Sequence, residues 1–445
     1  MSKQLRIWLF ALLGTLLATS SLLAEGVITM TTSKRVGERI SLQIEANGNV
    51  TIDGAQETGQ TNEDGQKYYT IENQTITIRG DVTELDCSWN QLTSLDVSKN
   101  TALRYLDCDL NNLTSLDVSK NTALTKLNSY ENQLISLDVS KNTALRYLDC
   151  GLNKLTSLDV SKNIALTVLG CSSNKLTSLD VSKNIALTSL GCQANQLTSL
   201  DVSSCTALTS LVCYLNELTS LDVSKNIALT GLDCSGNQLT SLDVSKNIAL
   251  TELSCYNNQL TSLDLPESTI LETLYCSGNQ LTSLNLPNST ALTTLDCSFN
   301  QLTSLDVSKN TALTVLGCDG NKLTSLDVSK NTALTVLGCD GNKLTSLDVS
   351  KNTALTELDC NGNKLTNLNI SGCARLEVLF CFSNCINGKA MTKLVNSLPN
   401  RRGMAHGTVF LVDRSSKKKD KNRCSAADVT TAKKKNWEVG QVRAF

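Results

Sequence analysis

The chain has 445 residues, enough for two or three globular domains, but only 4% are aromatic, three are proline, and Leu, Ser, Thr, Asn and Asp recur in fixed phrases. This composition argues against ordinary globular domains and indicates a repeat array, whose thin stacked layers need few large side chains. The net charge of −2 conceals an acidic body and a basic end, because residues 388–445 carry 14 Lys and Arg against 4 Asp and Glu, whereas 1–387 carry 26 against 38.

The first 24 residues predict a secretory signal peptide. Lys3 and Arg6 precede an apolar stretch over 7–17, which is the order that such peptides require. Small residues place the cleavage site after either Ser20 or Ala24. The apolar stretch is short for a membrane span, and an uncleaved N-terminal anchor is the alternative.

Residues 25–81 predict a small β cap ahead of the repeats. The segments ISLQIEA, NVTID and YYTIENQTITIRG alternate in polarity and are separated by Gly and Asn, which is typical of short strands joined by turns. A repeat array exposes its apolar interior at both ends, so each end needs such a cover.

Residues 82–386 consist of a 21-residue unit, LxxLxCxxNxLTSLDVSKNTA, which recurs about fifteen times without insertion. A Cys column runs from Cys87 to Cys381, with Ser129 as its one substitution, and an Asn follows three residues later in every turn. Two successive turns over 304–345 are identical, which indicates recent tandem duplication. A fixed period of this length predicts a solenoid with one unit per turn.

Each unit divides into two similar halves of ten or eleven residues, too short for a regular helix in addition to a turn. Each half therefore predicts one short strand, in which Leu106 and Cys108 point inward while Tyr105, Asp107 and Asp109 point outward. The expected fold is a mostly β solenoid with parallel strands on both faces, weak curvature and roughly 4.8 Å between turns.

The Asn column is expected to be structural. An amide side chain both donates and accepts, so a stacked column can satisfy backbone groups of the turns that the strand ladders leave unpaired. The column begins with Asn90, Asn111, Asn132 and Asn153.

Eighteen cysteines in an exported chain would normally indicate disulfides, but fourteen lie in the inward column. In-register parallel side chains point the same way, which suits S–S bonding poorly, so we expect buried thiols that pack as small apolar groups. A metal or iron–sulfur column would need ligands that converge on one point. Cys205 and Cys373 are expected in turns, and a Cys385–Cys424 bridge is left open. The structural cysteines begin with Cys87, Cys108 and Cys150.

After the last repeat, residues 387–445 predict a basic α/β cap. The basic run over 417–423 is expected to form an exposed loop. The expected elements are helices over 389–398 and 426–436 and strands over 408–413 and 437–442.

The repeat phrase LxxLxCxxNxLTSLDVSxNTxL resembles the 21-residue class of leucine-rich repeat found in internalin-like surface proteins of Bacteroidetes-type bacteria. The resemblance covers residues 82–386, and the ending, with NGKAMTKLVNSLP and AKKKNWEV, is similar to the tail of such proteins. It implies a secreted or cell-surface protein engaged in adhesion or host interaction. The family has no shared catalytic residues to carry over.

The LDVSKN phrase predicts an outward column of carboxylates, from Asp96 to Asp348, with Asn285 and Asn369 as exceptions. A Lys three residues after most of these Asp residues, such as Lys99, Lys120 and Lys141, offsets the repulsion between stacked carboxylates. We favour a solvated, charge-balanced face. Calcium ligation along the column is the alternative, because oxygen ligands repeat there at close spacing.

Few residues could support catalysis. The chain has a single histidine, His406, and lacks a Gly-rich phosphate loop and the HExxH and GxSxG motifs. A repeated array gives every Asp the same environment, whereas carboxylate catalysis needs two carboxyls with different pKa values. We therefore expect no enzyme activity, no cofactor and no metal site.

The half of the unit that holds the Cys varies at its outward positions, and it contains every aromatic residue of the repeats. Exposed aromatics on a rigid sheet are favoured contacts in protein and glycan recognition, although drift at unconstrained positions is the alternative. We favour the two ends of this face over its middle. The candidate binding residues are Trp89, Tyr105, Asp107, Tyr130, Tyr147, Tyr214, Tyr256, Tyr275, Phe299, Phe380 and Phe382.

The sequence thus predicts a non-enzymatic binding scaffold, a monomeric secreted or surface adhesin that recognises a protein or glycan on host or bacterial surfaces. No nucleic-acid partner is expected. Contact with a membrane is expected only through the signal peptide or through association with the cell envelope. One alternative is a structural envelope component held by its basic C-terminal cap. A calcium-stabilised scaffold is the other.

Overall fold

The computed structural model describes residues 26–267, 270–413 and 420–440. The predicted signal peptide and Lys417–Lys419 of the basic run lie outside the described residues. The chain divides into two compact units, Met1–Ala186 and Leu187–Phe445. None of the helices in the described part is long and apolar enough to cross a membrane.

The N-terminal unit begins with a cap of antiparallel strands. β1 (Val27–Thr32) pairs with β6 (Thr75–Arg79), and β2 (Arg39–Ala46) pairs with β5 (Lys67–Ile71). Alternate residues of β1, such as Ile28, are fully buried, as the alternating polarity predicts. The two further strands are β3 (Thr51–Asp53), beside β6, and β4 (Ala55–Thr61), beside β5.

The cap also pairs with both halves of the first repeat. β2 is antiparallel to β7 (Val82–Asp86), and β1 is antiparallel to β8 (Leu92–Asp96). In addition, Ser41 N donates to Asn90 Oδ1 at 2.9 Å, and Asn90 Nδ2 donates back to Ser41 O at 2.6 Å. The cap therefore covers the sheet edge that a solenoid would expose at this end.

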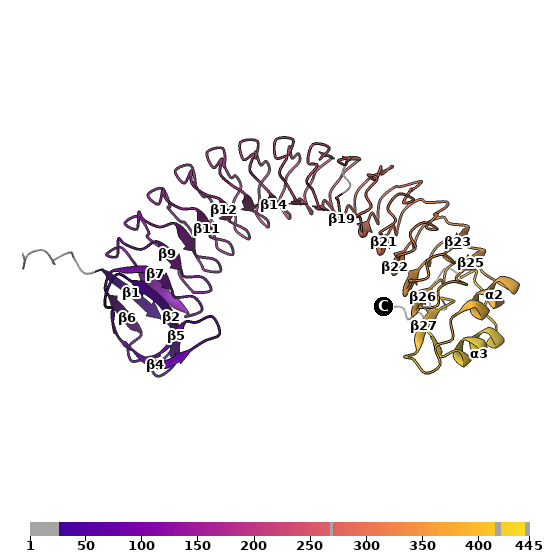
Figure 1. Cartoon of the computed structure of the whole chain (residues 1–445), viewed down its shortest axis with the longest axis horizontal. Helices are drawn as coiled ribbons and strands as arrows, with labels where there is room; N and C mark the ends of the chain where they lie inside the picture. Colours follow the sequence, from indigo (N-terminus) through magenta and orange to yellow (C-terminus); the bar gives the residue numbers. More distant parts are fainter. Residues whose placement is uncertain (1–25, 268–269, 414–419, 441–445) are drawn as a thin grey trace, which may run out of the picture. The chain divides into compact units, whose positions relative to one another are not determined.

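The Cys half of each turn forms a short strand, and these strands stack in parallel. In the first unit residue i lies opposite residue i+21, for example Leu106 opposite Leu127. Figure 1 shows them side by side along one edge of the turns, next to the cap. After β7, this unit contains β9 (Tyr105–Asp107), β10 (Lys126–Asn128), β11 (Tyr147–Asp149) and β12 (Val168–Gly170).

The second unit repeats the same arrangement over its described residues, and the same register holds along its ladder, for example Leu295 opposite Leu316. The 21-residue period therefore predicts the parallel strands of both units. The strands are β13 (Ser189–Gly191), β14 (Ser210–Val212), β15 (Gly231–Asp233), β17 (Glu252–Ser254), β19 (Thr273–Tyr275), β20 (Thr294–Asp296), β21 (Val315–Gly317), β22 (Val336–Gly338), β24 (Glu357–Asp359) and β26 (Val378–Phe380).

The LDVSKN half is less regular than the sequence predicts. Within the described residues of the repeats, it pairs as parallel strands in two places: β16 (Ser241–Asp243) with β18 (Ser262–Asp264), and β23 (Ser346–Asp348) with β25 (Asn367–Asn369). Other copies bury the same Leu and Val without a regular ladder, as Leu158 and Val160 do. The expected weak curvature stays a prediction.

The core is a stack of thin layers of Leu, Val and Cys. Leu106, Cys108, Leu113 and Val118 are all fully buried. The column cysteines are buried as thiols, and Cys108 Sγ lies 3.4 Å from the carbonyl oxygen of Asn128 in the next turn. Burial raises the pKa of these thiols, which disfavours the reactive thiolate.

The turn cysteines and the remaining pair are also placed by the structure. Cys205 and Cys373 are buried where other turns have Asn, as expected. Cys385 is a free thiol, so the bridge to Cys424 that the sequence left open is not formed.

Each Asn of the first column joins successive turns. Asn153 Nδ2 donates to the carbonyl oxygens of Ser129, Cys150 and Gly151 at 2.9, 3.1 and 3.0 Å. Its Oδ1 accepts from Leu134 N at 2.9 Å. One side chain thus satisfies four backbone groups of two turns, and the pattern recurs along both units.

The Asn of the LDVSKN half forms a second column that is less fully bonded. Asn142 Nδ2 donates to Val118 O at 2.9 Å and to Asn121 O at 2.8 Å. Asn142 Oδ1 is buried without a hydrogen-bond partner. The residue spacing explains the difference, because this half has an extra residue between the Asn and the next inward Leu.

The exposed Asp column has a local role that the sequence analysis missed. Asp117 Oδ1 accepts from Ser119 N at 2.8 Å, and the same bond recurs in other turns. This bond lowers the pKa of Asp117. The carboxylates therefore close turns as well as face solvent.

The C-terminal cap extends the sheet and the Asn column. Asn422 Nδ2 donates to Cys381 O and Leu411 O, both at 2.8 Å, and Asn422 Oδ1 accepts from Ile386 N at 2.8 Å. Asp420 and Asn422 are buried, so the prediction of an exposed loop over 417–423 is wrong for this part of it. The elements are α2 (Lys389–Ser397), β27 (Gly407–Phe410), α3 (Ala426–Lys434) and β28 (Trp437–Val439); β27 pairs with β26 and with β28.

Replacing one Asn of the first column should destabilise the fold strongly. Asn153→Ala removes these four hydrogen bonds from backbone groups of two turns, and we expect a loss of about 3 kcal/mol in the free energy of unfolding. Urea unfolding followed by circular dichroism measures it. The exposed neighbour Lys154→Ala is the control, and equal losses in the two variants would contradict the role assigned to the column.

Candidate functional site

Four outward positions of each Cys half define a surface in each unit, which we call the Cys-strand face. They lie three residues and one residue before the column Cys, and one and two residues after it. In the second turn they are Tyr105, Asp107, Asp109 and Leu110. Because the strands are in register, each position forms a column along the stack.

Acidic residues are concentrated on this face. In the first unit it holds six acidic residues and one Lys; in the second it holds seven acidic residues and no Lys or Arg. On the LDVSKN side, by contrast, a Lys follows most of the Asp residues three positions later and offsets their charge. The acidic residues of the face are Glu84, Asp86, Asp107, Asp109, Glu131, Asp149, Asp233, Glu252, Asp296, Asp319, Asp340, Glu357 and Asp359.

The single Lys of the face lies between two tyrosines. Lys126 Nζ is 4.5 Å from the ring centroid of Tyr105 and 5.0 Å from that of Tyr147. It also donates to the hydroxyl of Tyr105 at 3.2 Å. These cation–π contacts fix three half-buried side chains on adjacent strands as a single cluster.

Asp107 is not the exposed contact residue that strand alternation predicts. It is only 9% exposed, and its carboxylate accepts from Tyr105 Oη at 3.2 Å and Asn128 Nδ2 at 3.1 Å. Its side chain therefore orients its neighbours. Beside it, burial and the charge of Asp107 raise the pKa of Asp109 to about 6, and Asp109 Oδ1 is buried without a partner.

The last column of the face has an unusual backbone. In every turn the residue directly before the column Asn has a positive φ, between 49° and 65°. Only glycine adopts this conformation without steric cost, which for other residues is about 1 kcal/mol or more. Glycine occupies five of the fifteen positions. The other ten are Trp89, Leu110, Glu131, Leu152, Ser173, Ala194, Leu215, Asn257, Phe299 and Ser383.

Several of these strained positions carry large apolar side chains that are exposed. Trp89 is 67% exposed, Phe299 66% and Leu215 59%. Glycine in the next turn provides room for two of them, since a Cβ on Gly320 would lie 2.6 Å from Phe299 Cδ1 and one on Gly236 would lie 3.0 Å from Leu215 Cδ2. The side chains are thus held in place while most of their surface remains in water.

The other aromatic candidates also lie on the face. Tyr256 and Tyr275 are exposed, whereas Tyr130, Tyr214 and Phe382 are half-buried. At the C-terminal end Phe380 stacks on Phe410 of β27, with ring centroids 5.0 Å apart. The sequence analysis identified these residues because they are aromatic. It missed the backbone column, although the five glycines at that position were a visible signal.

Two shallow hollows open on the face. In the first unit, Lys34, Tyr68 and Trp89 line a hollow of about 620 Å³ together with Asp86 and Asp109. Lys34 Nζ donates to Arg39 O at 2.9 Å, so a backbone carbonyl already binds this ammonium group.

The second hollow, of about 480 Å³, lies in the second unit between Tyr275 and Phe299. Its lining includes the carboxylates of Asp296 and Asp319. Gly317 lies between these residues and adds no side chain.

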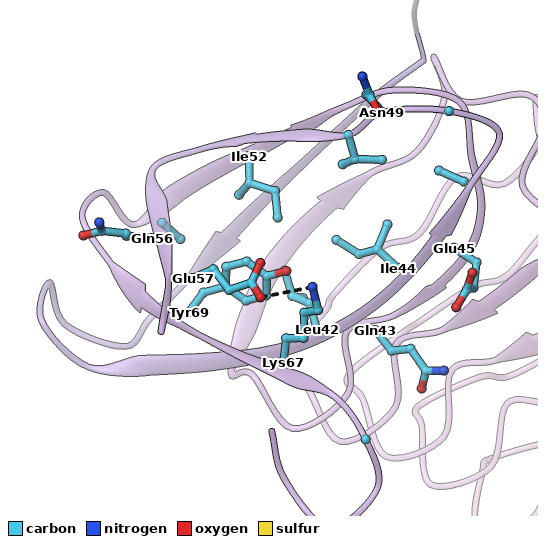
Figure 2. A pocket seen from close by; sticks show the side chains of 15 residues that line it. Leu42, Gln43, Ile44, Glu45, Asn49, Ile52, Gln56, Glu57, Lys67 and Tyr69 are labelled. Atoms are coloured by element: carbon cyan, nitrogen blue, oxygen red, sulfur yellow. Dashed lines mark ion pairs between the residues drawn. The ribbon is translucent and has the colours of Figure 1, made fainter. Parts of the chain in front are cut away.

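A larger pocket of about 740 Å³ lies in the N-terminal cap, away from the predicted binding residues. Figure 2 shows Ile44 and Ile52 pointing into it, with the ion pair of Lys67 and Glu57, 3.0 Å long, at its edge. This pair neutralises its own charges, and no candidate residue from the sequence lies in the pocket.

Among the residues that the structure describes, the single histidine forms an ion pair on the surface of the C-terminal cap. His406 is largely exposed, and its Nε2 lies 3.3 Å from Glu438 Oε2. Within the described residues, no group of three or more His, Cys, Asp or Glu is arranged to hold a metal ion.

Comparison with known proteins agrees with this geometry. A profile of leucine-rich repeats in two copies matches residues 271–310. Among solved structures, the functional domain of InlJ from Listeria monocytogenes, described as including a cysteine ladder, is 39% identical, with 77% of this chain and 78% of that chain covered and a TM-score of 0.69. This chain belongs to the internalin-like leucine-rich-repeat proteins.

More distant structures share the leucine-rich-repeat fold. InlF from Listeria monocytogenes is 21% identical over 66% of this chain and 85% of that chain, with a TM-score of 0.52. YopM from Yersinia enterocolitica is 24% identical over 77% of this chain and 74% of that chain, with a TM-score of 0.59. None of the curated protein sequences matches this chain. Leucine-rich-repeat proteins are generally non-enzymatic binding scaffolds, which supports the sequence-based expectation of binding.

Backbone strain at Trp89 should be measurable. Trp89→Gly should be about 1 kcal/mol more stable to unfolding than Trp89→Ala, because glycine accepts the positive φ and alanine does not. Urea unfolding of the two variants gives the difference. The same pair at Glu84, an exposed strand residue, should show the opposite order, and an alanine preference at both positions would contradict the strain.

The partly buried carboxyl of Asp319 should make stability depend on pH. Burial and the neighbouring Asp340 raise the pKa of Asp319 to about 8. The folded chain therefore holds a proton that the unfolded chain releases near pH 4, and the resulting stabilisation is lost as the pH rises towards 8. Asp319→Asn should raise the thermal unfolding midpoint relative to the natural chain at pH 9 and change it little at pH 4.

Asp306→Ala on the opposite side is the control. Its hydrogen bonds to Ser308 lower the pKa of Asp306, so the carboxylate stabilises the fold above about pH 4 and not below it. This variant should lower the midpoint at neutral pH. The same sign in both variants would contradict the assignment.

Proposed function

We propose that this chain is an exported binding scaffold, a secreted or cell-surface adhesin of bacterial origin, Bacteroidetes-type by its repeat, that recognises a protein or glycan as a monomer through its Cys-strand face. One observation carries the proposal. Large side chains such as Trp89, Leu215 and Phe299 are exposed at backbone positions where glycine would be less strained.

The rigidity of the face supports this proposal. Side chains fixed before binding lose less conformational entropy when a partner arrives, and aromatic residues supply most of the energy in many interfaces. The cluster of Tyr105, Lys126 and Tyr147 has both properties, because its rings are held by the Lys between them. Its neighbours Asp107 and Asn128 are fixed by hydrogen bonds.

Export rests on the predicted signal peptide and on likeness to InlJ. Abundant buried thiols suit an exported protein only if they stay protected, and their complete burial with raised pKa provides that protection. No catalytic step is assigned to the chain, and binding alone constitutes its proposed activity.

Replacing Tyr105 and Tyr147 together by Ser should weaken adhesion of the purified chain to cells or to a glycan and protein array. Ser occupies the same column at Ser189 and Ser210, so the strands tolerate it. The variant loses two half-buried rings and the cation–π contacts that hold Lys126. We therefore expect binding to fall roughly tenfold or more. Surface plasmon resonance against the captured ligand measures the change.

Ile135→Thr is the control for this experiment. It removes an exposed apolar side chain from the LDVSKN half and restores the residue that this position has in most turns. Adhesion should be unchanged. If Ile135→Thr weakens binding and the tyrosine variant does not, the binding surface lies on the other side of the solenoid.

A further inference from the structure

The hollow between Tyr275 and Phe299, here called the Phe299 hollow, has aromatic walls. Tyr275 is 38% exposed and lies two turns before Gly317, whose missing side chain opens the space. Phe299 has φ 53° and rests on Gly320 in the next turn. The Phe299 ring is therefore held in place, and both rings are reachable by a ligand.

Carboxylates form the polar part of the hollow. Asp296 Oδ1 would lie 2.9 Å from a Cβ on Gly317, so this carboxylate extends over the glycine. Asp319 in the same way lies against Gly338 in the next turn, and its Oδ2 accepts from Ser298 Oγ at 3.2 Å. The Cys-strand face of this unit carries no Lys or Arg at its defined positions, so no cation on this face balances the carboxylates.

Asp319 is also coupled to the following turn. Its Oδ1 accepts from Asp340 N at 2.9 Å, and the neighbouring Asp340 carboxyl raises the pKa of Asp319. Burial and this neighbouring carboxyl disfavour the ionised form of Asp319, whose pKa of about 8 keeps it protonated at neutral pH. The proton occupies a place that a positive group could take.

We propose that the Phe299 hollow binds the cationic side chain of an Arg- or Lys-rich polypeptide partner. The cation lies between the rings of Tyr275 and Phe299 and is paired by Asp296 and Asp319. This assignment rests on the proposed function of the Cys-strand face and names the chemical class of its partner.

Charge complementarity selects a basic polypeptide over the other ligands. A neutral sugar could stack on the rings, but it would leave the carboxylates unneutralised in a partly desolvated site. A guanidinium satisfies both parts, since it stacks on aromatic faces and donates to carboxylates. The other acidic residues of the face, Glu252 and Glu357 among them, extend the same attraction along the stack.

The bound cation should displace the proton held by Asp319. The pKa of Asp319 is raised to about 8, and that of Asp359, on β24 beyond Asp340, to about 6. A cation favours the ionised carboxylates, so binding releases protons below these pKa values and tightens as the pH rises. The acidic groups around Asp319 on β20, β22 and β24 and the turns after them are Asp296, Asp340, Glu357 and Asp359.

The test uses the full mature chain and a fluorescent hexa-arginine peptide, with hexa-citrulline as its neutral isostere. Arginine keeps its charge over the whole pH range, so any pH dependence belongs to the protein. Anisotropy titrations at 150 mM salt should show binding of hexa-arginine alone. Affinity should rise roughly tenfold between pH 6 and pH 9 in the natural chain.

Four variants separate the hollow from general attraction. Phe299→Gly and Asp296→Asn should each weaken binding roughly fivefold or more, and circular dichroism checks that they fold. Asp319→Asn should remove most of the pH dependence. Glu252→Gln removes one charge from the same face outside the hollow and should change affinity less than about twofold.

Three results would overturn the assignment. Equal binding of hexa-citrulline would indicate a neutral ligand, and equal losses in Glu252→Gln and Asp296→Asn would indicate diffuse attraction. If Asp319→Asn kept the full pH dependence, Asp319 would not be the group whose proton binding displaces. If these occur while the Tyr105 and Tyr147 variant still loses adhesion, the proposed function stands and only this inference fails.

Discussion

The hydrogen bonds of the Asn column determine the geometry of every turn. Asn153 reaches three carbonyls and one N–H in two turns, and it does so only if its side chain points inward at the end of the Cys strand. The chain must reverse direction sharply just before the Asn, which requires a positive φ at the preceding residue. The stabilising column and the strained column are therefore two consequences of one turn.

This link between the Asn side chain and the turn explains which parts of the fold could be predicted from the sequence and which could not. The period of 21 residues predicts the strands, the inward Leu and Cys, and a fixed place for the Asn, because each depends only on position within the unit. Ladder formation on the LDVSKN side is less predictable, since an extra residue between Asn121 and Leu124 changes the turn and leaves the side-chain oxygen Asn121 Oδ1 without a partner. The C-terminal cap was predicted, but the role of Asn422 in it was missed, because that role depends on contacts between residues far apart in the sequence.

Burial on the candidate face depends on neighbours rather than on alternation. Alternation places Asp107 outward, yet its carboxylate is nearly buried by Tyr105, Asn128 and Asp109. The aromatic candidates could be found from residue type alone. The position of Lys126 between two rings could be recognised only from the register of three strands. Sequence therefore predicts which columns face outward, and only the structure shows which side chains in them remain accessible.

Tandem duplication gives the acidic face a property that a single turn lacks. The identical turns 304–324 and 325–345 place Asp319 and Asp340 at equivalent positions one turn apart, so the duplicated carboxylates are neighbours. On the LDVSKN side the same duplication is harmless, because Lys309 and Lys330 are copied together with Asp306 and Asp327. Repetition thus preserves charge balance on one side and concentrates negative charge on the other. Where a varied or aromatic residue such as Phe299 lies beside these carboxylates, that part of the repeated surface differs from the other turns and forms a distinct site.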